Sequence, residues 1–439
     1  MLKHLKKIIL VFSILIIAAL SFAFYSISTS RKLPPVEEHL KKLSLEMKAG
    51  PVSKEMDAFL LKDVLKKPDE KLTSLFFKSG VALGKWLKEP AKVAALLQKE
   101  SEGLSALKKA LLSKGCLPNR MGLTEKKPHH KPVQLFSGAK WLALEAILRA
   151  QQNKPTEAAD DLLRYDGRYL HYTNHCKLSL VGAMTISASQ KALRRAMSYL
   201  LRHPSLDAKV AARVVERLYA WEQVKNPIKG ALITEGEYRA EMIRGLLKKM
   251  HIAQKNKKKV ETMLPVTGFY YDPEHSVMMD RRMVRCQVYF ASLKPHELPG
   301  KVCKFEKEIT KIKGYSRWQL YLTYNAIGWI LAGVAAPNLK LYQVRWYQMV
   351  PCGTARLRAR LLTAIPALKK ASKGKKALPA PVNAFTQKAF NPKEPASMRC
   401  EHAKTKKEFG KELPLPEAVP SEPSKENPTP KSPKAPNKR

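Results

Sequence analysis

The chain has 439 residues, of which 45% are hydrophobic, and this excludes a wholly disordered protein. Its length allows two or three domains or one elongated helical array. Its 80 Lys and Arg residues against 37 Asp and Glu residues give a formal charge of +43, which favours contact with anionic surfaces, although the positive residues are spread too evenly to outline one shaped patch.

Residues 1–30 form a predicted signal anchor. Three lysines precede an apolar run at residues 8–25, in which Ser13 and Ser21 are the polar residues. A helical run of this length can cross the roughly 30 Å hydrocarbon core of a bilayer. The lysines favour a cytoplasmic N-terminus, which places the bulk of the chain outside the cytoplasm, in a bacterial periplasm. The alternative is secretion after signal-peptide cleavage near Ala23, because residues 21–23 resemble a small-x-small cleavage site.

Residues 31–135 form a predicted helical N-terminal region that is rich in Leu and Lys. One apolar series runs from Phe59 to Leu65 and another from Val93 to Leu111, both with the spacing of one helical side. Glycines and prolines within residues 114–134 predict a loop.

Residues 136–370 form a predicted helical-hairpin domain. A helix is expected from residue 137 to Gln152, and Pro155 then restarts a second helix, because Pro suits the first turn of a helix but not its interior. This pair resembles a tetratricopeptide hairpin. Further helices are expected at residues 178–202 and 206–222, but no period repeats three times, so no true repeat array is predicted.

Four more segments follow in the same domain. Helices are expected at residues 232–253, near 276–292 and from about 338 to 370. The apolar segment 318–336 could be a second membrane span, but its polar side chains favour a buried helix.

Residues 371–439 form a predicted flexible Lys/Pro-rich tail, because residues 412–439 contain eight prolines and few large apolar side chains.

The six cysteines are compatible with disulfides in an exported chain. Their wide spacing excludes a zinc ribbon or a Cys-x-x-Cys redox motif. The loop between Cys286 and Cys303 is short, so this pair is the favoured bridge, while six free buried thiols are the alternative. The other four are Cys116, Cys176, Cys352 and Cys400.

No catalytic, cofactor or metal site is predicted. His171 and His175 have the i, i+4 spacing of metal ligands next to Cys176, but no Glu lies between them, and surface or capping roles are favoured. His129 and His130 lie in a loop without partners at ligand spacing. Asp160 and Asp161 are adjacent on a helix, so their carboxylates point about 100° apart and a paired-carboxylate site is not expected. The aromatic loop Phe269–Pro273 is a candidate binding loop, but anchoring between helices is the favoured role.

Several short strings together resemble a loose group of uncharacterised bacterial proteins with an N-terminal membrane segment and a helical body. In that group a C-terminal Asp-Pro-Phe-x-Gly-Lys-Pro-like string recurs, similar to the end of pilin-like secretion subunits. This chain has Asn383-Ala384 in place of Asp-Pro and Gln387 in place of Gly. The resemblance implies architecture and location but no activity. It rests on residues 141–150, 154–155, 158–163, 180–186, 268–273, 325–328, 335–337 and 382–390.

These features lead to three functional hypotheses. The first is a non-enzymatic, membrane-anchored scaffold that binds an unknown protein partner, because helical stacks present extended grooves. The second is charge-driven binding of an anionic polymer or membrane surface, motivated by the lysine runs at 255–259 and 369–376. Nucleic acid is not the expected polymer, since no recognition motif is visible. The third, an enzyme with an unrecognised helical site, is not favoured.

Overall fold

The structure is a computed structural model, and every regular element in its described part is a helix. Only two isolated β-bridges occur there, between Val52 and Cys116 and between Val382 and Ala389. The predicted all-α class is therefore confirmed for this part of the chain. The described residues are 50–62, 64–66, 90–118, 131–236, 239–240, 273–298, 341–365, 367–368 and 378–392, with the single residues 21, 301, 303, 307, 311 and 400.

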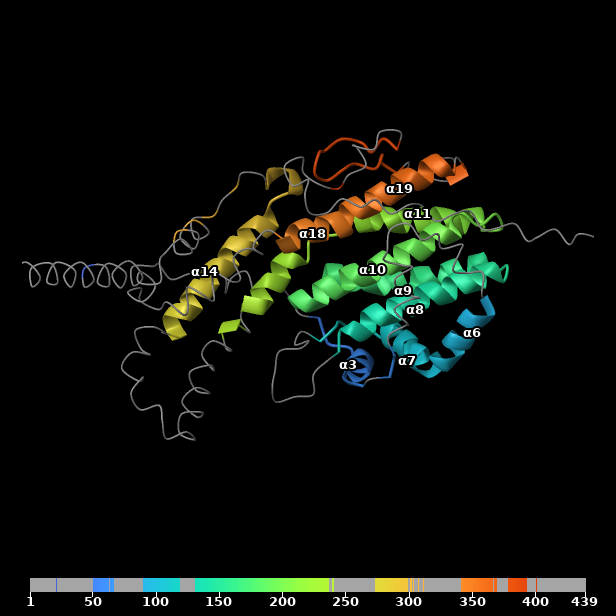
Figure 1. The fold of residues 1–439 in the computed structure, drawn as a ribbon, viewed down its shortest axis with the longest axis horizontal. Helices are drawn as coiled ribbons and strands as arrows, with labels where there is room; N and C mark the ends of the chain where they lie inside the picture. Colours follow the sequence, from blue (N-terminus) through green and yellow to red (C-terminus); the bar gives the residue numbers. More distant parts are fainter. Residues whose placement is uncertain are drawn as a thin grey trace, which may run out of the picture.

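The helices stack in layers (Figure 1). Helices α8, α9 and α10 contact one another in the middle, α3, α6 and α7 lie on one side, and α11, α18 and α19 lie on the other. Their bounds are α3 (Lys54–Leu61), α6 (Pro90–Lys99), α7 (Ser101–Leu112), α8 (Val133–Gln151), α9 (Pro155–His175), α10 (Leu180–Leu200), α11 (Ala208–Glu222), α14 (Pro273–Ser292), the short 3-10 helix η2 (Pro295–Glu297), α18 (Leu341–Met349) and α19 (Pro351–Ala364). Residues 228–236 are also helical.

One main cluster of buried apolar side chains runs through these layers, from Met56 in α3 to Leu361 in α19. The predicted regions 31–135 and 136–370 both contribute side chains to this core. Where α7 crosses α8, Gly138 allows a close approach, because a Cβ atom there would lie 2.3 Å from Cδ2 of Leu107. Helix α14 contributes Val284, Val288 and Ala291 to the main cluster. Other side chains of α14, among them Met283 and Phe290, form a second, smaller cluster.

The predicted hairpin of α8 and α9 is confirmed. Asn153 follows α8 with a φ of 60°, a left-handed conformation that Asn tolerates better than most residues, and Pro155 begins α9. The two following helices also match their expected positions. Ser179 and Asp207 cap them by accepting hydrogen bonds from backbone amides of the first turn.

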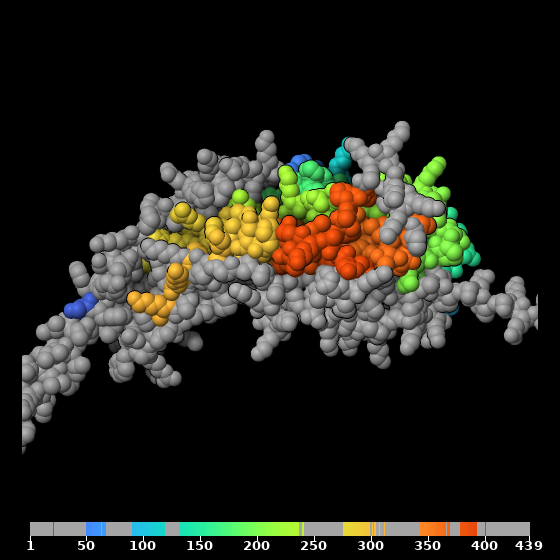
Figure 2. Space-filling model, turned by 90° about the horizontal axis from the view of Figure 1, so that it is seen from above, coloured from blue at the N-terminus to red at the C-terminus, as the bar shows by residue number. Residues whose placement is uncertain are grey.

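Two expectations near the C-terminal end need correction. The single helix expected over residues 338–370 is two helices, α18 and α19, because Pro351 lacks the amide hydrogen that a continuous helix needs there. Residues 378–392, expected to belong to the flexible tail, pack against α19 with Phe385 and Phe390 buried. Seen from above, α14 and the orange segments of α18, α19 and 378–392 lie along one face (Figure 2).

In the parts of the chain that the structure describes, no helix combines the length and the apolar composition needed to span a bilayer. The expected span at residues 8–25, apart from Ser21, lies outside the described residues. The same is true of the apolar segment 318–336 and of residues 401–439. The anchor, the buried 318–336 helix and the end of the tail therefore stay predictions.

Candidate functional sites

All six cysteines are paired in three disulfides. The bond between Cys286 and Cys303 is the one favoured from the sequence, and it is confirmed. The other two bonds join Cys116 to Cys176 and Cys352 to Cys400, over sequence separations of 60 and 48 residues. No short-range pattern in the sequence indicates such pairings.

Cys116 is held in place by a short parallel contact with the segment before α3. Its amide donates to the Pro51 carbonyl at 2.8 Å, and its carbonyl accepts from the Ser53 amide at 3.0 Å. Gly115 before it has a φ of 117°, and a Cβ atom there would lie 2.7 Å from the Ser53 nitrogen, so only glycine fits. The guanidinium of Arg168 in α9 also binds this turn, as it donates to the carbonyls of Leu111, Ser113 and Gly115.

The last turn of α9 brings two histidines to this disulfide. His171 is half-buried, His175 is exposed, and their ring centroids are 5.0 Å apart. Cys176 is the C-cap residue of the helix. The ligand atoms of Cys116, His171 and Cys176 all lie within 4.8 Å of one another. The sequence spacing identified His171, His175 and Cys176, but Cys116 joins them only through the fold.

The environment of the His171 imidazole favours its neutral form. Burial lowers its pKa, and the electrostatic effects of the neighbouring Arg168 and His175 side chains lower it further. A neutral imidazole has a free nitrogen lone pair, which is the form that binds metal ions. The expectation that the chain has no metal site stays a prediction: three donor residues lie together here, but two of their sulfurs are bonded to each other.

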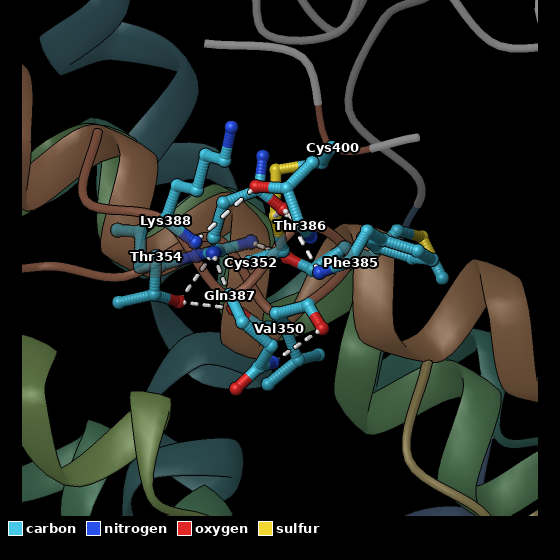
Figure 3. Close-up of a disulfide and its surroundings, with 12 residues drawn as sticks. Val350, Cys352, Thr354, Phe385, Thr386, Gln387, Lys388 and Cys400 are labelled. Atoms are coloured by element: carbon cyan, nitrogen blue, oxygen red, sulfur yellow. Dashed lines mark hydrogen bonds between the residues drawn. A yellow bond between two sulfur atoms is a disulfide. The ribbon is translucent and has the colours of Figure 1, made fainter. Parts of the chain in front are cut away.

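The disulfide between Cys352 and Cys400 lies at the start of α19, where both cysteines pack in one cluster with Phe385 and Phe390 of the 378–392 segment (Figure 3). Asn383 organises the turn: its side-chain oxygen accepts from the Phe385 amide at 2.9 Å, and its own amide donates to the Lys388 carbonyl at 2.8 Å. Gln387 has a φ of 58°. These are two positions where the chain departs from the resembling group; Asn383 can form the turn as Asp would, whereas Gln387 adopts a conformation that Gly prefers.

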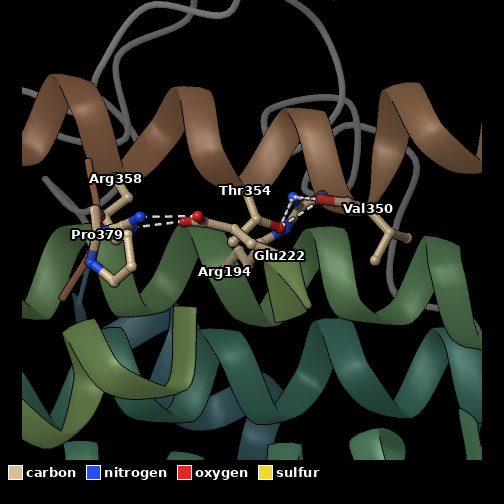
Figure 4. Close-up of polar contacts among 6 residues, drawn as sticks. All are labelled: Arg194, Glu222, Val350, Thr354, Arg358 and Pro379. Atoms are coloured by element: carbon tan, nitrogen blue, oxygen red, sulfur yellow. Dashed lines mark hydrogen bonds and ion pairs between the residues drawn. The ribbon is translucent and has the colours of Figure 1, made fainter. Parts of the chain in front are cut away.

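Polar side chains link α10 and α11 to α19 (Figure 4). Arg358 donates two hydrogen bonds to the carboxylate of Glu222, at 2.5 and 2.8 Å, and a third to the Pro379 carbonyl at 2.9 Å. Arg194 donates to Thr354 and to the carbonyls of Met349 and Val350 around the break before α19. These contacts position the C-terminal helices and do not resemble a catalytic set.

A third buried polar group, Asp166, connects α9 with α11. Its carboxylate accepts from Nε1 of Trp221 at 2.8 Å and from Nη1 of Arg217 at 3.3 Å. Complete burial raises the pKa of Asp166, and the attraction of Arg217 and the Trp221 hydrogen bond oppose the rise only in part.

The remaining candidates do not form a site in the described residues. Asp160 pairs with Arg213, and Asp161 pairs with Arg149 at 2.7 Å, so these carboxylates act separately. His129, His130 and the aromatic residues 269–272 lie outside the described part of the chain.

No family model, curated protein or solved structure matches this chain. The resemblance noted from short strings stays a prediction, and the function must be argued from the residues themselves.

Proposed function

We propose that this chain is a non-enzymatic scaffold of a bacterial cell envelope, anchored through residues 8–25, whose helical body binds another protein. The observation that carries the proposal is the pairing of all six cysteines. Disulfides form and persist in oxidising compartments such as the periplasm and are rare in the cytosol. The lysine cluster before the apolar N-terminal run supports the same location.

The mode of partner binding follows from the helical layers. A stack of helices offers extended surfaces between neighbouring elements, which suit a protein partner more than a small molecule. Several apolar side chains remain exposed on these helices and loops, among them Val133 (60% exposed), Tyr289 (46%) and Val382 (43%). In the described residues the buried ion pairs connect helices to one another, as expected of a scaffold.

Location can be tested with a fusion after residue 45 to a reporter that is active only outside the cytoplasm. We expect an active reporter and a full-length protein in the membrane fraction, with the six thiols blocked from labelling until a reductant is added. The mass of the N-terminus distinguishes an uncleaved anchor from cleavage near Ala23. A silent reporter together with free thiols in cells would contradict the proposed location.

Partner binding can be tested by placing a photo-crosslinking amino acid at Val133, Tyr289 or Val382 in turn. We expect a discrete crosslinked species at one of these exposed apolar positions in intact cells. Lys209 is an exposed polar position on α11 and serves as the matched control. The scaffold proposal is wrong if every position gives only the background seen at Lys209.

A second function, charge-driven binding of an anionic surface, is favoured by the net charge of +43. Binding to vesicles that contain anionic lipid should weaken steeply with salt, because the release of counterions contributes to the affinity. Vesicles of zwitterionic lipid are the control. Equal retention on both kinds of vesicle, or binding that salt does not change, would exclude this function.

A further inference from the structure

We propose that Cys116, Cys176 and His171 bind a zinc ion when the disulfide between the two cysteines is reduced. The three ligand atoms lie within 4.8 Å of one another, and they come from two segments that the fold brings together. Two thiolates and one imidazole are a donor set that Zn²⁺ prefers. The disulfide and the zinc ion use the same sulfur atoms, so the two states exclude each other.

The framework around the three donors does not depend on the disulfide alone. Cys116 is fixed by donating its amide hydrogen to the Pro51 carbonyl and by accepting from the Ser53 amide, and the three hydrogen bonds that Arg168 donates fix the turn before it. His171 and Cys176 sit on and directly after the last turns of α9. Reduction should therefore leave the two sulfurs close together, with small side-chain rotations creating room for the ion.

The disulfide is converted into the zinc site in two steps, reduction and then metal binding. A dithiol reductant transfers two electrons and two protons to the Cys116–Cys176 bond and becomes a disulfide itself. Zinc binding then releases the two thiol protons to solvent. One Zn²⁺ ion, two thiolates and one neutral imidazole form a complex without net charge, which can be half-buried beside the Arg168 guanidinium at little electrostatic cost.

The fourth zinc position is open to water or to His175. The rings of His171 and His175 are 5.0 Å apart on the same helical face. A rotation of the exposed His175 side chain would bring its nitrogen toward an ion held by the other three ligands. In the part of the chain that the structure describes, two sulfurs, two imidazoles and the Arg168 side chain lie at or near the site.

The test uses the full-length chain reduced with a phosphine, which does not compete for zinc as a dithiol does. The chain is alkylated with N-ethylmaleimide with and without Zn²⁺, and each cysteine is followed separately by peptide mass spectrometry. We expect zinc to slow alkylation of Cys116 and Cys176 by about tenfold or more. The other four cysteines should change little, and the oxidised chain should take up no zinc.

His171→Ala should abolish the protection of Cys116 and Cys176, whereas His296→Ala, at a half-buried histidine in η2, should preserve it. His175→Ala reports on the fourth position: a partial loss indicates a ligand, and no loss indicates water. Far-UV circular dichroism checks that each reduced variant keeps its helices, and Cys116→Ser provides a second variant that removes a thiolate. The proposal is wrong if zinc protects all six cysteines equally, protects none, or protects the pair equally in His171→Ala.

Discussion

Glu222 at the end of α11 and Arg358 in α19 form a buried, bidentate ion pair, although the two residues are 136 positions apart in the sequence. Their side chains are 6% and 2% exposed. The same guanidinium also donates to the Pro379 carbonyl, so Arg358 joins α11, α19 and the C-terminal segment. Burial raises the pKa of Glu222, and the hydrogen bonds and charge of Arg358 oppose this rise. The pair therefore fixes where the last helices dock.

The first prediction concerns the removal of one partner. Glu222→Gln keeps the side-chain shape but leaves a buried guanidinium without its counter-charge, and this should reduce the free energy of unfolding by about 3–5 kcal/mol. The double variant Glu222→Leu/Arg358→Met removes both charges and should recover most of that loss. Urea denaturation followed by circular dichroism measures these changes.

The control for this prediction is Arg149, whose pair with Asp161 is about one-third exposed. Arg149→Met should cost about 1 kcal/mol or less, because solvent screens exposed pairs. If the Glu222 and Arg149 variants lose equal stability, the buried pair does not hold the C-terminal helices as described.

The second prediction concerns the bond between Cys352 and Cys400. In the chain-entropy model, removing a cross-link between residues 48 positions apart costs about 4 kcal/mol. Cys352→Ala/Cys400→Ala should also expose the segment around Lys388 to trypsin, since Phe385 and Phe390 then lose their fixed position on α19. Cys286→Ala/Cys303→Ala is the control, and it should leave cleavage at Lys388 unchanged. Unchanged cleavage in Cys352→Ala/Cys400→Ala would show that this disulfide does not hold the 378–392 segment against α19.

Local sequence signals predicted the helices well and the contacts between distant segments poorly. Pro155 and the apolar series of α8 and α9 identify their hairpin, because capping and periodicity act within a few residues. The Glu222–Arg358 pair depends on the fold, and neither residue stands out in the sequence. The 378–392 segment falls in the predicted tail because Lys, Pro, Ala and Glu dominate the chain after residue 370, yet Phe385 and Phe390 are buried.

The candidate metal site shows the same difference between local sequence signals and contacts that depend on the fold. The i, i+4 spacing identified His171 and His175 and placed Cys176 beside them. Cys116 precedes Cys176 by 60 residues, and its position depends on Gly115, Pro51 and the reach of Arg168. Sequence spacing alone therefore identified too few neighbouring ligands to predict a metal site, and it favoured a surface role for the histidines.

The third prediction concerns Gln387, which has a φ of 58°. A non-glycine residue in the left-handed region carries a steric cost of about 1–2 kcal/mol. Gln387→Gly removes this cost but adds flexibility to the unfolded chain, so a net stabilisation of about 0.5–1 kcal/mol is expected. The thermal midpoint of unfolding measures it. Asn153→Gly, at a φ of 60°, is the matched control and should gain less, because Asn tolerates this region; a loss of stability in Gln387→Gly would contradict the prediction.

The fourth prediction concerns the pH dependence of stability through Lys191 in α10. Burial and, after it in size, the positive charges of Arg195, Arg194 and Arg356 together lower the pKa of Lys191 to about 8. An unfolded lysine has a pKa of about 10.4. Between these values the unfolded chain binds more protons, so the contribution of Lys191 to the free energy of unfolding rises with pH, by about 3 kcal/mol in all.

Lys191→Met keeps an apolar stem of similar length and removes the charge. Compared with the parent, we expect it to be more stable at pH 7, with the difference shrinking between pH 8 and 10.5, as measured by urea denaturation at each pH. The comparison is needed because a chain with a charge of +43 loses repulsion at high pH in any case. Lys209→Met on the exposed side of α11 should show no such pH-dependent difference. If the difference in free energy of unfolding between Lys191→Met and the parent stays constant across this range, the buried, cation-rich surroundings of Lys191 do not lower its pKa.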